Sequence, residues 1–180
     1  MTDPSDQAPS LAVIGMGLVC PVGMDATSSC LAIHAGIAGL ADLDEFPPLA
    51  YWDEKGNELE AVGGSALEAA AVAAGLNRLV RLAAPALKDA VTEAGVPLDD
   101  LPPTHLVQAM PAVGRPGRDN RLESLFVPRL ERACGIPSGR LKMTPVYDGH
   151  TGAITALNKA GELLQTGAER VIVGCVDSLV

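Results

Sequence analysis

The chain has 180 residues, which suits one domain of ordinary size. Apolar residues make up 48% of it and exclude wholesale disorder, whereas aromatic residues make up only 3%, so the core must be built from Ala, Val, Leu and Ile. The 22 acidic residues against 13 Lys and Arg give a net charge of -9, which disfavours nucleic acid and anionic membrane surfaces as partners.

No targeting or membrane signal is visible in the sequence. The most apolar stretch, residues 11–24, is shorter than the roughly 18 residues of a membrane span. The first ten residues are polar and acidic, unlike a secretory signal. We expect a cytoplasmic protein with reduced thiols and no metal site, because no CxxC pair occurs among Cys20, Cys30, Cys134 and Cys175. We also expect no cofactor.

The first half of the chain begins with a flexible tail at residues 1–10. The apolar run 11–14, ended by Gly15, predicts a buried strand. Residues 25–35 predict a helix capped by Asp25, and an irregular surface excursion at 41–62 precedes a further helix at 65–74.

The central segment predicts a helix, a strand and another helix. Apolar residues recur every three or four positions over 78–94, with Pro85 expected to kink or split this helix. A strand at 105–110 and a loop at 115–119 should follow. A helix at 122–134 should come next, although it contains Pro128.

The clearest unit lies at the C-terminal end. Residues 142–146 and 171–173 predict strands, and Asp148 is expected to cap the helix between them, which Gly167 ends. Strand, helix, strand implies a parallel crossover and an α/β fold, a mostly parallel sheet covered by helices. The expected buried stripe of this helix is Ala153, Ile154, Leu157, Ala160, Gly161 and Leu164.

Several candidate chemical features are weak. Gly15 and Gly17 follow the first predicted strand, but Cys20 stands where a dinucleotide-binding loop has its third glycine, so a tight turn is the favoured interpretation. No Ser or Cys occupies a GxSxG setting. For His34, His105 and Asp177 we favour structural roles or none, because the histidines lack the spacing of metal ligands.

His150 is the one candidate site residue. It lies in the segment VYDGHTG, residues 146–152, between a predicted strand and the first turn of a helix. Such a junction carries free backbone N–H groups and the positive end of the helix dipole, where an enzyme can hold an anionic nucleophile or an oxyanion. The alternative is an ordinary polar residue of a first helical turn.

Residues at both ends of the chain resemble the β-ketoacyl synthases, condensing enzymes of the thiolase superfamily. Residues 14–23, IGMGLVCPVG, resemble the opening strand and turn of that family, and 31–40, LAIHAGIAGL, resemble its L-x-x-G-x-S-G-I segment with Ala38 in place of Ser. Residues 84–95 resemble the helix before its second strand. Residues 151–180, which include VGCVDS at 173–178, resemble the helix and strand after its nucleophile.

The resemblance implies decarboxylative condensation of acyl thioesters delivered on acyl carrier protein or coenzyme A. A Cys at a strand-to-helix junction carries the acyl group in this family, and two further residues come from a second half of the fold. The helix dipole favours the thiolate that this chemistry needs. The resemblance also implies dimerisation through the strand before the nucleophile, here near residues 143–146.

This chain departs from the family pattern in two ways. His150 stands at the position of the nucleophile, and no Cys or Ser occurs between Leu141 and Glu162. The second half, with its catalytic histidines, has no match, so we expect residues 11–180 to form a single, incomplete thiolase-like domain with an open sheet edge.

Three hypotheses follow. The favoured one is a non-catalytic partner or scaffold subunit that associates with itself or with a second thiolase-like chain, with acyl carrier protein as a possible further partner. The alternative is an acyltransferase, a 3-oxoacyl-acyl carrier protein synthase, that is active only with a second chain or a missing segment. The third is an unrelated α/β binding domain.

Overall fold

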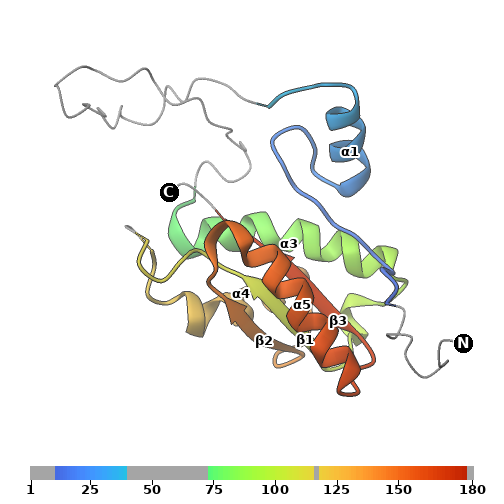
Figure 1. Cartoon of the computed structure of the whole chain (residues 1–180), viewed down its shortest axis with the longest axis vertical. Coiled ribbons are helices and arrows are strands. Elements are labelled where there is room, and N and C mark those ends of the chain that lie inside the picture. Colours follow the sequence, from blue (N-terminus) through green and yellow to red (C-terminus); the bar gives the residue numbers. More distant parts are fainter. Residues whose placement is uncertain (1–10, 40–72, 116–117, 178–180) are drawn as a thin grey trace, which may run out of the picture.

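The computed structural model describes residues 11–39, 73–115 and 118–177 (Figure 1). Three strands form one sheet in the order β2-β1-β3, and all of them run parallel. The expected α/β fold with a parallel sheet covered by helices is therefore confirmed. The elements are α1 (Ala26–His34), α3 (Gly75–Glu93), η2 (Leu98–Asp100), β1 (Thr104–Ala109), α4 (Leu122–Cys134), β2 (Leu141–Val146), η3 (Gly149–Thr151), α5 (Gly152–Gln165) and β3 (Val171–Cys175).

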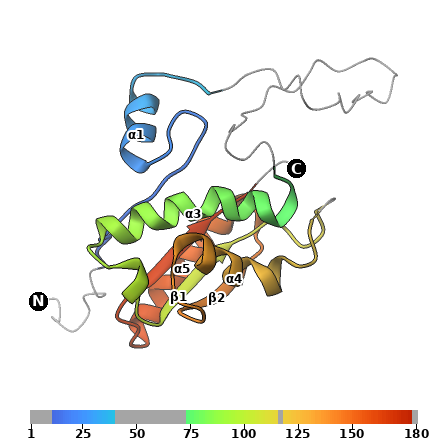
Figure 2. The same cartoon turned by 180° about the vertical axis from the view of Figure 1, so that it is seen from behind.

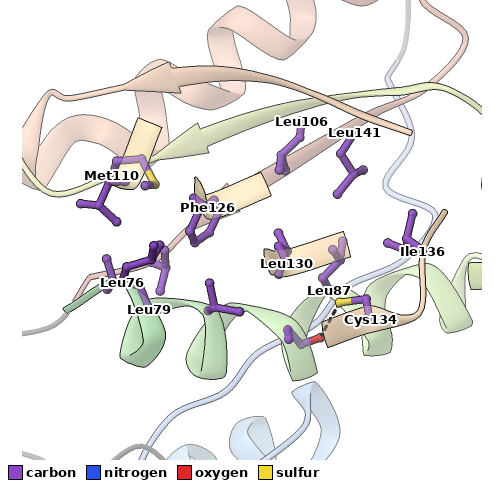
Figure 3. Packing of buried hydrophobic residues seen from close by; sticks show 14 of the residues in the cluster. Leu76, Leu79, Leu87, Leu106, Met110, Phe126, Leu130, Cys134, Ile136 and Leu141 are labelled. Carbon is purple, nitrogen blue, oxygen red and sulfur yellow. Dashed lines mark hydrogen bonds between the residues drawn. The ribbon is translucent and has the colours of Figure 1, made fainter. Parts of the chain in front are cut away.

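The two faces of the sheet are covered differently. On one face, α3 and α4 bury a large cluster of leucines together with Phe126 (Figure 3). On the other face, α5 packs against Val107 and Val146 through Ala156 and Ala160. The strand alternation explains this division, because consecutive residues such as Leu106 and Val107 point to opposite faces.

Helix α4 shows how the pattern of the sequence forms a buried face. Leu122, Phe126, Leu130 and Cys134 recur every four residues and are all buried. Gly135 follows them with a φ of 75°, a left-handed conformation that glycine adopts without strain, and ends the helix. The predicted helix at 122–134 is confirmed at both ends.

A buried carboxylate secures the turn between α4 and β2. Glu131 is 2% exposed and accepts the backbone N–H groups of Gly139 at 3.0 Å and Leu141 at 2.8 Å. These two bonds satisfy a charged side chain that would otherwise be costly to bury. They also fix the start of β2 relative to the helix before it.

The prediction of a buried strand at residues 11–14 is wrong. This segment forms no regular secondary structure and pairs with no described strand, and Val13 is 80% exposed. The residues that follow this segment pass close to α3, where a Cβ added at Gly15 or Gly17 would collide with the backbone of Ala90 or Ala86. The two glycines therefore serve a close approach to a helix rather than the tight turn that the sequence suggested.

The helix α1 lies outside the layers of the sheet, beyond α3 (Figure 2). The predicted cap is confirmed, because the Asp25 carboxylate accepts the Ser28 N–H at 2.7 Å. This bond lowers the pKa of Asp25. A second carboxylate, that of Asp89 on α3, accepts the Ala26 N–H at 2.9 Å and ties α1 to the body.

Other predictions for the middle of the chain have mixed outcomes. The helix predicted at 78–94 is confirmed as α3, and Pro85 does not split it. The predicted strand at 105–110 is confirmed as β1 within one residue, and Arg115, Arg118 and Asp119 lie in a loop as expected. The tail at 1–10, the excursion at 41–62 and most of the helix at 65–74 lie outside the described residues.

The predicted buried stripe of α5 is wrong in part. The buried residues of the helix are Gly152, Ala156 and Ala160, whereas Ile154 and Leu157 point outward. The small residues are buried because they let α5 lie close to the sheet. A Cβ added at Gly152 would lie only 3.2 Å from the Cβ of Ala109. The expected end of the helix is confirmed, since Gly167 follows it with a φ of 104°.

Candidate functional site

The carboxyl ends of the three strands meet at one edge of the sheet. Ala109 of β1 is in register with Val146 of β2 and with Cys175 of β3. The ladder extends one step further, because Met110 N–H donates to Val146 O at 2.9 Å and Val176 N–H donates to Ala109 O at 3.2 Å. Parallel α/β sheets bind ligands at this edge, so it is the natural place for a site.

His150 lies at this edge, between a strand and a helix as predicted. It is the middle residue of η3, the single turn that joins β2 to α5. Its side chain is exposed and makes no hydrogen bond or ion pair to the described residues. An imidazole that acts as a nucleophile or base is held by a second group that fixes its tautomer, and no described residue does this here.

The expected cap at Asp148 is wrong in its detail. The Asp148 side chain makes no capping hydrogen bond, whereas its backbone carbonyl accepts the Thr151 N–H at 3.2 Å and the Thr151 hydroxyl at 3.0 Å. The Gly152 N–H in turn bonds to Gly149 O. Two backbone amides of the junction are therefore used within the turn itself, which reduces the set that could hold an anion.

Three side chains that the sequence analysis missed support the junction. Arg118 donates to Glu123 at 3.0 Å and to the Pro111 carbonyl at 3.2 Å, and its guanidinium lies 5.2 Å from the centre of the Tyr147 ring. The Tyr147 hydroxyl donates to the same Glu123 oxygen at 3.0 Å. This network joins the loop after β1, the first turn of α4 and the end of β2.

The network shifts the pKa values of its members. The bonds from Tyr147 and Arg118 lower the pKa of Glu123. Burial, together with the bond to Glu123, raises the pKa of Tyr147. Both shifts favour a charged carboxylate beside a neutral phenol, an arrangement that stabilises the loop and leaves Glu123 a poor proton carrier near neutral pH.

The third strand ends in a second polar contact. Asp177 follows β3, where the sequence placed it, and forms an ion pair with Arg115 of the loop after β1. Cys175 is exposed at the end of β3, and partial burial and the charge of Asp177 raise its pKa. A raised pKa keeps the thiol protonated, which is the opposite of what a catalytic cysteine needs.

The remaining candidates stay apart from this edge. His34 is exposed in the last turn of α1, and His105 is the second residue of β1, at the opposite end of that strand. Within the described ranges no three His, Cys, Asp or Glu side chains are grouped so as to hold a metal ion. His150 is therefore the only one of the three histidines that lies at the carboxyl edge.

Comparisons with models of known protein families and with curated proteins find no match to this chain. The family resemblance depends on the residues quoted from the sequence. In the described part of the chain, no helix combines the length and the apolar character that crossing a bilayer requires.

Proposed function

We propose that this chain is a β-ketoacyl synthase-like protein that carries out no catalysis and acts as a partner or scaffold subunit in the cytoplasm. The observation that carries the proposal is the position of His150. It stands exposed and unsupported at the strand-to-helix junction where the resembling family places its cysteine.

An imidazole is a poor substitute for that cysteine. A thiolate is both a good nucleophile and a good leaving group, whereas an acyl-imidazole is lost readily to water. The exposed thiol at this edge, that of Cys175, has a raised pKa. Neither His150 nor Cys175 is therefore suited to carry an acyl group, which supports a non-catalytic role.

The surface near this edge supports association with another chain. Ile154 and Leu157 of α5 are 64% and 60% exposed, three residues apart on one helix. The strand β3 pairs only with β1 among the described strands, so its other edge presents backbone groups that another strand could use. We propose a second copy or a second thiolase-like chain as the partner, with acyl carrier protein as a further partner.

The association is tested by size-exclusion chromatography with light scattering on the full chain. We expect a dimer or larger species, and replacement of Leu157 by Asp should shift it toward the monomer. Asn158→Asp is the matched control, because it adds the same charge at the next exposed position of α5. A well-behaved monomer at every concentration contradicts self-association.

The absence of catalysis is tested by intact-mass spectrometry after incubation with an acyl thioester of coenzyme A or of acyl carrier protein. We expect no adduct on His150 and no release of thiol above the rate of His150→Ala. An acyl group that appears on the wild-type chain and disappears in His150→Ala contradicts the proposal and supports an acyltransferase.

A further inference from the structure

A hollow of about 320 Å³ lies between the N-terminal segment, α3 and the end of β3, and His150 is not among the residues that line it. Its walls come from the segment 17–21, from one face of α3 and from the residues that follow β3. This volume is at the lower end of the range of roughly 300–1,000 Å³ that small-molecule sites occupy. The hollow can therefore hold a small ligand.

An arginine without a partner lines this hollow. The Nε atom of Arg78 is inaccessible to solvent and has no hydrogen-bond partner, and the described residues offer the guanidinium no ion pair. The side chain of Arg78 is half-buried, and a buried Nε–H group without a hydrogen-bond partner is costly, so bonding to an anion would be favourable.

The other charged residue of the lining does not neutralise Arg78. Asp177 lines the same hollow, but its carboxylate is paired with Arg115. No ion pair joins Asp177 to Arg78. The positive charge of Arg78 is therefore available to a ligand, even though the whole chain carries a net charge of -9.

The rest of the lining is mainly apolar. Leu18 and Val19 come from the N-terminal segment, Leu82 and Ala86 from α3, and Val176 from the end of β3. Apolar walls with one well-placed polar group are typical of sites that bind an apolar body and orient it by its head group. Inorganic phosphate alone would leave these walls uncovered.

We propose that this hollow binds a small monocarboxylate with a short aliphatic chain. Its carboxylate accepts hydrogen bonds from Arg78, whose planar guanidinium matches two carboxylate oxygens, and its chain covers Leu18, Leu82 and Val176. No bond is made or broken, so the site is a binding site independent of the junction at His150.

Calorimetric titration of the full chain with sodium octanoate is the first test. Octanol carries the same chain without the charge, and inorganic phosphate carries charge without the chain. We expect octanoate to bind at least about 10-fold more tightly than either, since a charged hydrogen bond is worth about that factor. Octanol binding as tightly as octanoate, or phosphate binding more tightly, overturns the proposal.

Two variants locate the site. Arg78→Gln should weaken octanoate binding about 10-fold, whereas Arg81→Gln, which removes a charge from an exposed position of the same helix, should change it less than about 2-fold. Ala83→Leu adds volume at the lining without removing charge and should also weaken octanoate binding at least about 10-fold. Equal effects of Arg78→Gln and Arg81→Gln contradict a specific site.

Thiol protection gives a readout on the unmodified chain, free of any folding defect in a variant. Cys20 and Cys175 line the hollow, whereas Cys30 is exposed on α1 and does not. Octanoate should slow alkylation of Cys20 and Cys175 by N-ethylmaleimide, measured by peptide mapping, and leave Cys30 unchanged. Unchanged rates at Cys20 and Cys175 place octanoate elsewhere and overturn the assignment.

Discussion

The two faces of the sheet differ in how they are packed, and the difference separates stability from the candidate site. The face beneath α3 and α4 buries Phe126 and many leucines, whereas the face beneath α5 buries four small residues, Val107, Val146, Ala156 and Ala160. Large side chains bury more apolar area and stabilise more. The α3–α4 face therefore holds the fold together, while the thinner α5 face presents the junction that carries His150.

The largest expected effect on stability comes from a change on the α3–α4 face. Phe126 is fully buried, and Phe126→Ala should lower the free energy of unfolding by about 3–5 kcal/mol, because it leaves a large cavity among packed leucines. Val107→Ala, on the face beneath α5, should lower the free energy of unfolding by only about 2 kcal/mol. Urea denaturation measures both, and an equal or reversed order would break the comparison.

The buried carboxylate of Glu131 should give the next effect. Glu131→Gln keeps the shape but turns an amide group toward the N–H of Gly139 or Leu141, so we expect a loss of about 2 kcal/mol. Glu169→Gln, at an exposed position, is the control and should stay within about 0.5 kcal/mol of wild type. A neutral result for Glu131→Gln would mean that the turn into β2 is held by other contacts.

A third change tests the packing of the central strand against β3. The Gln108 side chain lies over Gly174, where an added Cβ would come within 2.1 Å of its oxygen. Gly174→Ala should therefore cost about 1–3 kcal/mol through overpacking. Adding Gln108→Ala should recover part of this loss, and strictly additive effects of the two changes in denaturation would contradict the contact.

The smallest effect concerns the polar network beside the junction. The bonds from Tyr147 and Arg118 lower the pKa of Glu123, so its contribution to stability is present above its ordinary pKa of 4.5 and is lost as the pH falls through the lowered value. Glu123→Gln should slightly lower Tm at pH 7, and the difference from wild type should shrink toward pH 3. A difference that is constant over this range would contradict the shift.

The regular helices that cover the sheet could be predicted from the sequence. Which of two apolar faces is buried, and against which element, could not. The apolar residues from Leu122 to Cys134 define a single helical face, and α4 begins and ends where this pattern predicts. In α5 two faces are apolar, and only the sheet decides that the Ala156 side is buried and the Leu157 side is not. The run 11–14 is apolar enough for a strand, but apolarity does not say whether a sheet or a helix receives it.

For the candidate site, the position of His150 could be predicted from the sequence, but the contacts around it could not. The order of strand and helix around His150 places it at the carboxyl edge of the sheet, as the structure has it. The network of Arg118, Glu123 and Tyr147 joins two segments 24 residues apart. Neither a Tyr directly after a strand nor an Arg in the loop ahead of a helix that begins with Glu is distinctive, so nothing in the sequence marks their contact.

The most direct test of the central claim is the acylation of His150→Cys, which puts a thiol at the junction. Asn158→Cys, on an exposed position of the same helix away from its N-terminus, is the matched control. After incubation with an acyl thioester, intact-mass spectrometry and peptide mapping should show acylation of Cys at position 150 well ahead of position 158, and none on the wild-type His150, because the helix N-terminus favours the thiolate. Equal acylation at the two positions, or acylation of wild-type His150, would contradict the account.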